Sequence, residues 1–233
     1  MKPLISVIIP TLNEENYIER TLLAAKNQDF KGKYEIIVSD SSSKDKTVKI
    51  AKKFADKVIV TKKMGISAGR NEGAKASRGD LLLFLDADTM VLPNVLSEVA
   101  AYFEKHKNII GLNIPILCDN LKKNIFYMLA VYGFDMLKEA KLQPVYAVCF
   151  ACRRDYFFEA GCFPENVRVA EDIHFGEQLK KLGKLEFLQT TFAVTSSRRL
   201  EKWGAVKQLK AWPGGYFYFK YLKRQPAYPP IRN

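Results

Sequence analysis

Short apolar runs alternate with stretches of helical periodicity through the first hundred residues of the chain. Apolar runs bounded by polar turns predict strands at 4–9, 34–38, 58–60 and 81–85. Between them, apolar residues at helical spacing predict helices at 14–28, 45–54 and 67–76, and a further one opened by Pro93. Strands that alternate with helices form βαβ units, so we expect an α/β fold with a mostly parallel sheet and right-handed crossovers.

The pattern is less regular in the second half of the chain. It predicts strands at 109–117 (interrupted by Pro115), 145–151 and 185–195, and helices at 155–160 and 171–182. The stretch 125–137 is apolar and aromatic, and Asp135 is its single charge. It is too short to span a bilayer, so it is either a core helix or a helix lying at a membrane interface.

The composition fits one compact domain with a small appendage. Of the 233 residues, 48% are hydrophobic and 27% are charged. No run of eighteen apolar residues predicts a spanning helix, and Met1-Lys2-Pro3 leads directly into the first strand without the features of a secretory signal. A lone Cys149-x-x-Cys152 lies in an apolar run and is typical of small buried fillers rather than of a metal site, which fits a reducing cytoplasmic compartment.

The positive charge is concentrated at the C-terminal end. The net charge is +12, and segment 198–233 holds nine Lys or Arg but a single acid, Glu201. Eight aromatic residues lie among these cations: Trp203, Trp212, Tyr216, Phe217, Tyr218, Phe219, Tyr221 and Tyr228. This mixture suits the surface of an anionic membrane, and no nucleic-acid motif accompanies it. We therefore expect peripheral membrane contact and no nucleic-acid partner; the alternative is a basic tail packed on the domain by its aromatic residues.

Two spaced acids, Asp86 and Asp88, follow the apolar run 81–85, where a buried strand should leave the sheet. Ligands of open α/β sheets bind beyond the carboxyl ends of the strands. A pair of carboxylates there suits Mg²⁺ or Mn²⁺, which usually neutralises phosphate oxygens. The pair therefore indicates a metal-assisted transfer on a phosphate-bearing substrate, against the alternative of a solvated turn.

Polar clusters also follow the other strands, at 10–14, 39–47 and 65–73. Parallel strands bring such loops to one edge of the sheet, where they form one crevice. The glycine patterns of dinucleotide-binding oxidoreductases and of P-loop enzymes are absent, which argues against both classes.

A second acidic pair, Glu171-Asp172, opens the helix predicted at 171–182. The helix dipole favours a charged carboxylate in the first turn, so Asp172 is a candidate general base, and the alternative is a simple helix cap. His174 is a candidate third metal ligand, or else an ordinary polar helix residue.

Several motifs follow one another in a characteristic order. They are Val7-Ile-Ile-Pro10-Thr11-Leu12-Asn13-Glu14, Asp40-Ser-Ser-Ser-x-Asp45-x-Thr47, Gly65-x-x-x-Gly69-Arg70-Asn71-x-Gly73, Asp86-Ala-Asp88, Phe163-Pro164, Glu171-Asp172 and Leu179-x-x-x-Gly183-Lys184. Together they resemble a family 2 glycosyltransferase with the GT-A fold, over residues 4–195. The resemblance implies a Rossmann-like, mostly parallel sheet flanked by helices. It also implies a GT-A domain over 1–197, with a nucleotide-binding half (1–100) and an acceptor half (101–197), followed by the basic aromatic segment 198–233.

The resemblance also implies a chemistry and a set of site residues. Such enzymes are inverting transferases that use a nucleotide-diphosphate sugar and Mn²⁺ or Mg²⁺. Donor contacts would come from Pro10, Thr11, Leu12, Glu14, Asp40, Asp45, Arg70, Asn71 and Asp86. The metal would be held by Asp86 and Asp88, while Asp172 and its neighbour Glu171 would form the catalytic pair.

The run Ser196-Ser197-Arg198-Arg199 resembles one found in some membrane-associated members of that family. Two adjacent guanidinium groups suit a diphosphate, or the phosphate of a lipid acceptor. Met90 stands where some relatives have a glutamine that can assist the metal, so membership of that subgroup is not implied.

The expected function is sugar transfer from a UDP- or GDP-sugar to a lipid-linked or glycan acceptor at the cytoplasmic face of a membrane. The alternatives are transfer to a soluble acceptor, a sugar nucleotidyltransferase and a non-catalytic sugar-nucleotide binding module.

Overall fold

The computed structural model describes residues 5–125, 128, 144–167 and 170–204 of the chain. The strands are β1 (Ile5–Thr11), β2 (Tyr34–Asp40), β3 (Lys57–Val60), β4 (Leu81–Leu85), β5 (Thr89–Val91), β6 (Ile109–Asn113), β7 (Ile116–Cys118), β8 (Cys149–Arg153), β9 (Lys184–Phe187) and β10 (Ala193–Thr195). The helices are α1 (Ile18–Lys26), α2 (Thr47–Phe54), α3 (Ile66–Ala76), α4 (Val95–Lys105), α6 (Arg154–Glu159), α7 (Glu171–Leu179) and α8 (Arg198–Trp203), with a short 3-10 helix at Leu121–Lys123.

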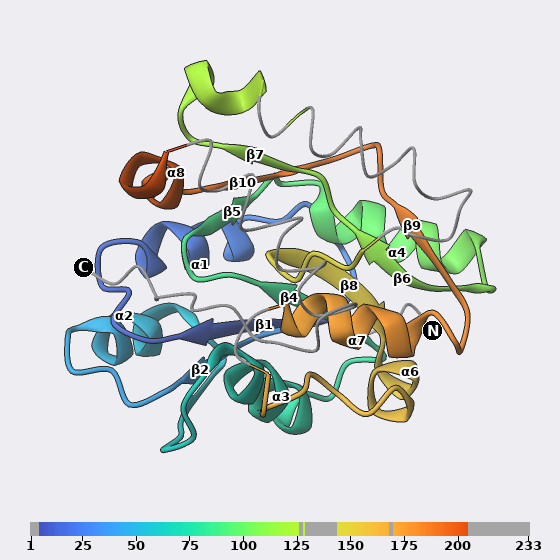
Figure 1. Cartoon of the computed structure of the whole chain (residues 1–233), viewed down its shortest axis with the longest axis horizontal. Helices are drawn as coiled ribbons and strands as arrows, with labels where there is room; N and C mark the ends of the chain where they lie inside the picture. The colour runs from blue at the N-terminus through green and yellow to red at the C-terminus, as the bar shows by residue number, and fades with distance from the viewer. Residues whose placement is uncertain (1–4, 126–127, 129–143, 168–169, 205–233) are drawn as a thin grey trace.

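A seven-stranded sheet forms the centre of the molecule, in the order β3-β2-β1-β4-β8-β6-β9. Its neighbouring strands pair in parallel except at β8, which is antiparallel to both β4 and β6. A smaller sheet has the order β5-β10-β7 and lies beside the main one (Figure 1). The predicted α/β fold with a mostly parallel sheet is therefore confirmed.

Helices cover both faces of the main sheet (Figure 1). On one face, Val7 and Ile9 of β1 pack with buried residues of α1, α2 and α4, such as Leu22 and Val99. On the other face, Ile8 of β1 packs in a cluster to which α3, α6 and α7 contribute. Successive strand residues point to opposite faces, so the unbroken apolar runs of β1 and β4 are what a strand buried on both faces requires.

Most predicted elements are present, with shifted ends. The strand predicted at 109–117 breaks near Pro115 into β6 and β7, as expected, but the two pieces belong to different sheets. The single strand predicted at 185–195 is instead two strands, β9 and β10, also in different sheets. Two elements, β5 and α8, were not predicted from the sequence. Each is only three to six residues long, too short to show a periodic pattern.

Cys149 and Cys152 lie in β8, which is central in the sheet, and both are free thiols with no exposed surface. Cys149 belongs to the apolar cluster on one face and Cys152 to the cluster on the other. The prediction that these residues are buried fillers is confirmed.

Most of the apolar stretch 125–137 and most of the basic segment 198–233 lie outside the described residues. Within that stretch, Ile125 and Met128 are described, and both are exposed. Among the helices that the structure describes, none is long and apolar enough to cross a membrane.

Candidate active site

Two loops at the carboxyl edge of the main sheet are joined by hydrogen bonds. The loop after β1 donates its Glu14 amide to Thr47 Oγ1 (2.7 Å) and its Glu15 amide to Asp45 (3.1 Å). Asp45 also accepts the Thr47 amide at the start of α2 (2.9 Å). Burial opposes the charge on Asp45, but the Thr47 and backbone hydrogen bonds outweigh burial and lower its pKa. These contacts hold together the two loops that are expected to bind the nucleotide.

Asp40 lies at the end of β2 and has no exposed surface. Its carboxylate accepts hydrogen bonds from Thr11 Oγ1 (3.0 Å), from the Ser43 amide (2.8 Å) and from the Ser43 hydroxyl. Asp40 therefore links the end of β1 to the loop after β2. Its contact with a nucleobase stays a prediction.

Arg70 of α3 links the two acidic motifs. It is 2% exposed, and its guanidinium donates to Asp86 Oδ1 and to Glu171 Oε1, both at 2.9 Å, and to the carbonyl of Ala147 at 3.1 Å. A buried arginine is stabilised only if such partners satisfy it. Residues 70, 86 and 171, which are far apart in the sequence, thus form one ionic cluster around a buried arginine.

Asp172 lies beside that cluster in the first turn of α7. Burial raises its pKa, and the negative charge of Glu171 raises it further, while Arg70 and the backbone amide of Ile173 oppose the rise. Ala170, the residue before this acidic pair, adopts the left-handed conformation with φ of 61°. An alanine rarely takes this conformation, and such strain is concentrated at functional sites.

Arg198, at the start of α8, connects two further acids. It forms a bidentate ion pair with Glu14 (2.8 Å to each oxygen), and its Nε lies 2.9 Å from Asp88 Oδ2. The Ser196 amide donates to the carbonyl of Asp88 (3.1 Å), which brings the end of β10 to the acidic loop. The sequence predicted Glu14 and Arg198 as site residues but did not predict that they pair.

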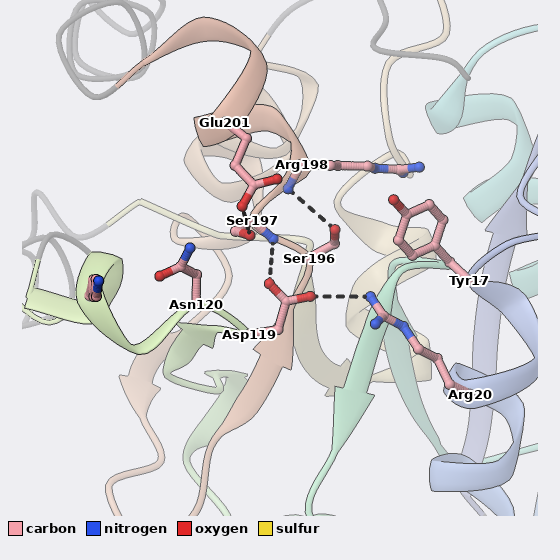
Figure 2. Close-up of a pocket in the computed structure, with 9 residues that line it drawn as sticks. Tyr17, Arg20, Asp119, Asn120, Ser196, Ser197, Arg198 and Glu201 are labelled. Atoms are coloured by element: carbon pink, nitrogen blue, oxygen red, sulfur yellow. Dashed lines mark hydrogen bonds and ion pairs between the residues drawn. The ribbon is translucent and has the colours of Figure 1, made fainter.

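A cavity of about 770 Å³ opens beside Arg198. It is lined by Tyr17, Arg20, Asp119, Asn120, Lys122, Ser196, Ser197, Arg198 and Glu201. Figure 2 shows the Tyr17 ring between the guanidinium groups of Arg198 and Arg20, whose carbons lie 4.5 and 4.8 Å from the ring centroid. The sequence analysis missed Tyr17, Arg20 and Asp119, since no motif marks them.

The acids at the end of β4 fit a hard divalent cation. Asp86 and Asp88 each use one oxygen for an arginine: Asp86 Oδ1 for Arg70 and Asp88 Oδ2 for Arg198. Burial raises the pKa of Asp88 to about 6, Arg198 opposes the rise, and the nearby charges of Asp86 and Glu14 add to it. A cation added to such a cluster would favour the ionised carboxylates.

His174 does not complete a set of metal ligands with these acids. Within the described part of the chain, no group of three or more His, Cys, Asp or Glu side chains is arranged to hold a metal ion. The predicted trio of Asp86, Asp88 and His174 is therefore not assembled, because His174 is carried by α7 with Glu171 and Asp172 rather than by the acidic loop. The metal prediction rests on the two aspartates.

Asn71, predicted as a donor contact, is engaged with the protein's own backbone. It is 4% exposed, and both ends of its amide bind the backbone of Phe163, at 2.8 and 3.0 Å. Its role in the structure is to hold the segment around Phe163 against α3.

Comparison with known proteins identifies the family. The family model described as glycosyl transferase family 2 matches residues 6–162, which is more than half of the chain. The chain belongs to this family. The matched region contains the loops after β1 and β2, helix α3 and the Asp86–Asp88 loop.

A relative of this family-2 chain is the poly(ribitol-phosphate) β-N-acetylglucosaminyltransferase TarS of Staphylococcus aureus. The two are 27% identical over 183 residues, which cover 72% of this chain and 30% of TarS. The chain thus matches less than a third of the length of that relative.

Solved structures share the fold. TarS residues 1–349 in complex with UDP-GlcNAc superpose with a TM-score of 0.65 at 23% identity, covering 82% of this chain and 58% of that one. The mannosyltransferase PcManGT of Pyrobaculum calidifontis, in complex with GDP-Man and Mn²⁺, gives a TM-score of 0.73 at 19% identity, covering 98% and 67%. The predicted GT-A fold of this family-2 chain is confirmed.

Proposed function

We propose that the chain is an inverting, metal-dependent glycosyltransferase that moves a sugar from a nucleotide-diphosphate sugar to a hydroxyl or phosphate of a lipid-linked or glycan acceptor. The observation that supports this most strongly is the connection of Asp86 to Glu171 through Arg70. It joins the expected metal and diphosphate end of the site to the expected acceptor end. A transferase needs both ends at a fixed separation, because the reacting groups must lie in near-attack geometry.

In this proposal the donor lies along the carboxyl edge of the main sheet. The loops of Pro10–Glu14 and Asp40–Asp45 surround the base and ribose, and Leu12, which is partly exposed, is free to contact them. Arg198 and Arg199 neutralise phosphate oxygens, for which a guanidinium fork is well suited. A divalent ion on Asp86 and Asp88 would supply charge stabilisation to the departing nucleoside diphosphate.

Asp172 acts as the general base. Its raised pKa means that it holds a proton well once that proton has left the acceptor hydroxyl, and general bases work best when their pKa lies near the working pH. Glu171 and Arg70 keep it in place rather than react. Attack by the activated oxygen on the face opposite the leaving diphosphate inverts the anomeric carbon.

We also propose that the chain works as a peripheral protein on the cytoplasmic face of a membrane. The support is the sequence of 198–233, with its nine cations, single acid and eight aromatic residues, together with the exposed Ile125 and Met128. Transfer to a soluble acceptor is the outcome expected if this segment does not bind lipid.

A binding and turnover panel tests the proposed function. UDP- and GDP-sugars are titrated with and without Mn²⁺ by thermal shift, since a ligand of the native state raises the apparent melting temperature. We expect a metal-dependent shift with one nucleotide class, reduced in Asp88→Ala, and sugar release or transfer whose product has the inverted anomer by NMR. Release of pyrophosphate from a nucleoside triphosphate and a sugar phosphate would instead identify a nucleotidyltransferase. Binding without any turnover would favour a non-catalytic module.

A further inference from the structure

The guanidinium of Arg198 already forms ion pairs with Glu14 and Asp88, at the place where a metal ion and the diphosphate of the donor are expected to bind. Two of its nitrogens hold both oxygens of Glu14, and its Nε holds one oxygen of Asp88. One face of the group stacks on Tyr17 at 4.5 Å. Side-chain exposure is 19% for Arg198 and 15% for both Glu14 and Asp88, so these ion pairs are only weakly screened by water.

A divalent cation and this guanidinium compete for the same carboxylate. Ion pairing lowers the negative charge of the cluster, and a metal ion that binds Asp88 must either displace Arg198 or bind beside a positive charge. The diphosphate of a donor carries the opposite charge and offers Arg198 a new partner. When donor and metal bind together, the metal ion pairs with Asp88 and the diphosphate pairs with Arg198. A metal ion alone gives Arg198 no new partner.

The backbone of α8 is anchored, so the side chain is the part able to move. Leu200 is 4% exposed and packs with Cys118, and the Ser197 amide donates to Asp119 Oδ1 at 2.9 Å. Glu201 accepts from the Ser197 hydroxyl at 2.8 Å. Arg198 itself borders the 770 Å³ cavity, so its side chain has open space on one side (Figure 2).

We propose that Arg198 is a tethered cation which neutralises Asp88 and Glu14 in the donor-free protein and transfers to the donor's diphosphate when the metal arrives. Glu14 is the positioning residue, because its bidentate contact orients the guanidinium without contacting the reacting atoms. The exchange makes metal binding depend on the nucleotide, which prevents the acids from being filled by a metal ion alone. This inference rests on the proposed function of the site.

The test measures binding rather than turnover. Free Mn²⁺ is followed by electron paramagnetic resonance in the absence of nucleotide, and binding of UDP and GDP is measured calorimetrically with Mg²⁺ present. In Arg198→Gln we expect the affinity for Mn²⁺ alone to rise about tenfold, and the affinity for the nucleoside diphosphate to fall about tenfold. Arg198→Lys, which keeps the charge but loses the fork, should change both affinities in the same directions by smaller factors.

Arg20→Gln is the matched control. It removes one positive charge from the same cavity and from the other face of Tyr17, but Arg20 pairs with Asp119 at 3.5 Å rather than with Asp88. We expect it to change the affinity for Mn²⁺ alone by less than about threefold. An equal gain in Arg20→Gln, or an unchanged or weaker Mn²⁺ affinity in Arg198→Gln and Arg198→Lys, would overturn the proposal. Wild-type protein that binds Mn²⁺ but no nucleotide would instead refute the proposed function, whatever the Arg198 variants do.

Discussion

Asp172 and Asp88 are acids of one site whose pKa values are both raised, but their neighbours differ. Burial is the main cause for each. For Asp172, the charge of Glu171 adds to the rise in pKa and Arg70 opposes it. For Asp88, Arg198 opposes the rise while Asp86 and Glu14 add to it. The two carboxylates can therefore serve different roles at the same pH, one as a base and one as a ligand.

Asp172→Asn should remove the general base while leaving the donor site intact. We expect kcat/KM to fall by about 10²–10⁴-fold, with nucleotide-sugar affinity unchanged. Because the pKa of Asp172 is raised, wild-type kcat/KM should rise with pH at a higher pH than an ordinary carboxyl group would give, since only the ionised form accepts a proton. The measurement is a pH–rate profile for both proteins. Full turnover of Asp172→Asn would show that the residue orients the acceptor rather than deprotonates it.

Asp88→Asn should stabilise the protein at alkaline pH. The pKa of Asp88 is about 6 in the folded state and about 3.8 when unperturbed, so the folded state binds the proton more tightly. Its contribution to stability is fully present below the unfolded value and is lost as the pH rises through the folded value. Above that pH the wild-type protein should be less stable than the variant by roughly 1–3 kcal/mol.

Thermal unfolding at pH 4 and pH 8 checks this prediction without added metal. The melting temperature of Asp88→Asn should exceed that of the wild type at pH 8, and the gap should narrow at pH 4. The exposed Asp155→Asn provides a control for loss of one carboxylate. A gap that is widest at pH 4 would contradict the prediction.

Among the elements, α3 carries the key arginine and packs unusually close to the sheet. A Cβ added at Gly73 would lie 2.4 Å from Cγ2 of Ile8, and one added at Gly69 would lie 3.0 Å from Cβ of Pro10. The two glycines thus let the helix backbone approach β1 and the loop after it. This approach places Arg70 under the end of β4, within reach of Asp86.

Gly73→Ala should therefore separate α3 from β1. Alanine is favoured over glycine in a helix by up to about 1 kcal/mol, but overpacking against a buried, branched side chain costs about 1–3 kcal/mol. We expect a net loss of about 1–2 kcal/mol, or a melting temperature lower by about 2–8 °C, together with slower turnover as Arg70 shifts. Lys75→Ala, on the exposed side of the same helix, is the control and should leave both unchanged. An unchanged melting temperature in Gly73→Ala would show that α3 can move away freely.

The elements that could be predicted from the sequence are those with a complete local signal. The apolar run 81–85 coincides with β4, and the strands β1 and β2 each extend two residues beyond their predicted C-terminal ends. The small sheet could not be predicted, because β5 and β7 have three residues each and are defined by pairing with β10, about eighty to a hundred residues away. The reversed direction of β8 likewise depends on its partners rather than on its own residues.

The same limit applies to the site. Sequence motifs located the acids and the arginines, but not which of them pair. The contacts of Arg70 with Glu171 and of Arg198 with Glu14 join residues 101 and 184 positions apart. No local pattern encodes such distances. The contact of Asn71 with Phe163 could not be predicted for the same reason, since the two residues are 92 positions apart.

At the scale of the whole molecule, the small sheet brings the beginning of the C-terminal segment to the active site. Strand β10 pairs with β5 directly after the Asp86–Asp88 loop, and Ser196 contacts Asp88 through the backbone. Arg198 therefore pairs with the acids Glu14 and Asp88 and is also the first residue of the basic segment 198–233. Under the proposed function, this places the first residues of the basic segment, 198–204, close to the acids expected to hold the metal.

This arrangement predicts salt-sensitive binding to anionic vesicles. Segment 198–233 carries eight of the twelve net positive charges, and each cation near a negative leaflet contributes about 1 kcal/mol. We expect the full chain to sediment with vesicles containing phosphatidylserine at low salt and to be released at about 0.5 M salt, where the Debye length falls to a few ångströms. Vesicles of neutral lipid should bind it weakly through the aromatic residues alone.

Two sets of lysine substitutions decide whether this segment is the binding surface. The test variant replaces four of its lysines by glutamine: Lys207, Lys210, Lys220 and Lys223. The control makes the same charge change on the exposed side of α2 and the residue before it: Lys46, Lys49, Lys52 and Lys53. The first set should weaken vesicle binding about 100-fold or more, because several surface contacts are lost together, whereas the second should have little effect. Equal weakening by both sets would assign the attraction to overall charge and favour a soluble acceptor, because the C-terminal segment would then have no special contact with lipid.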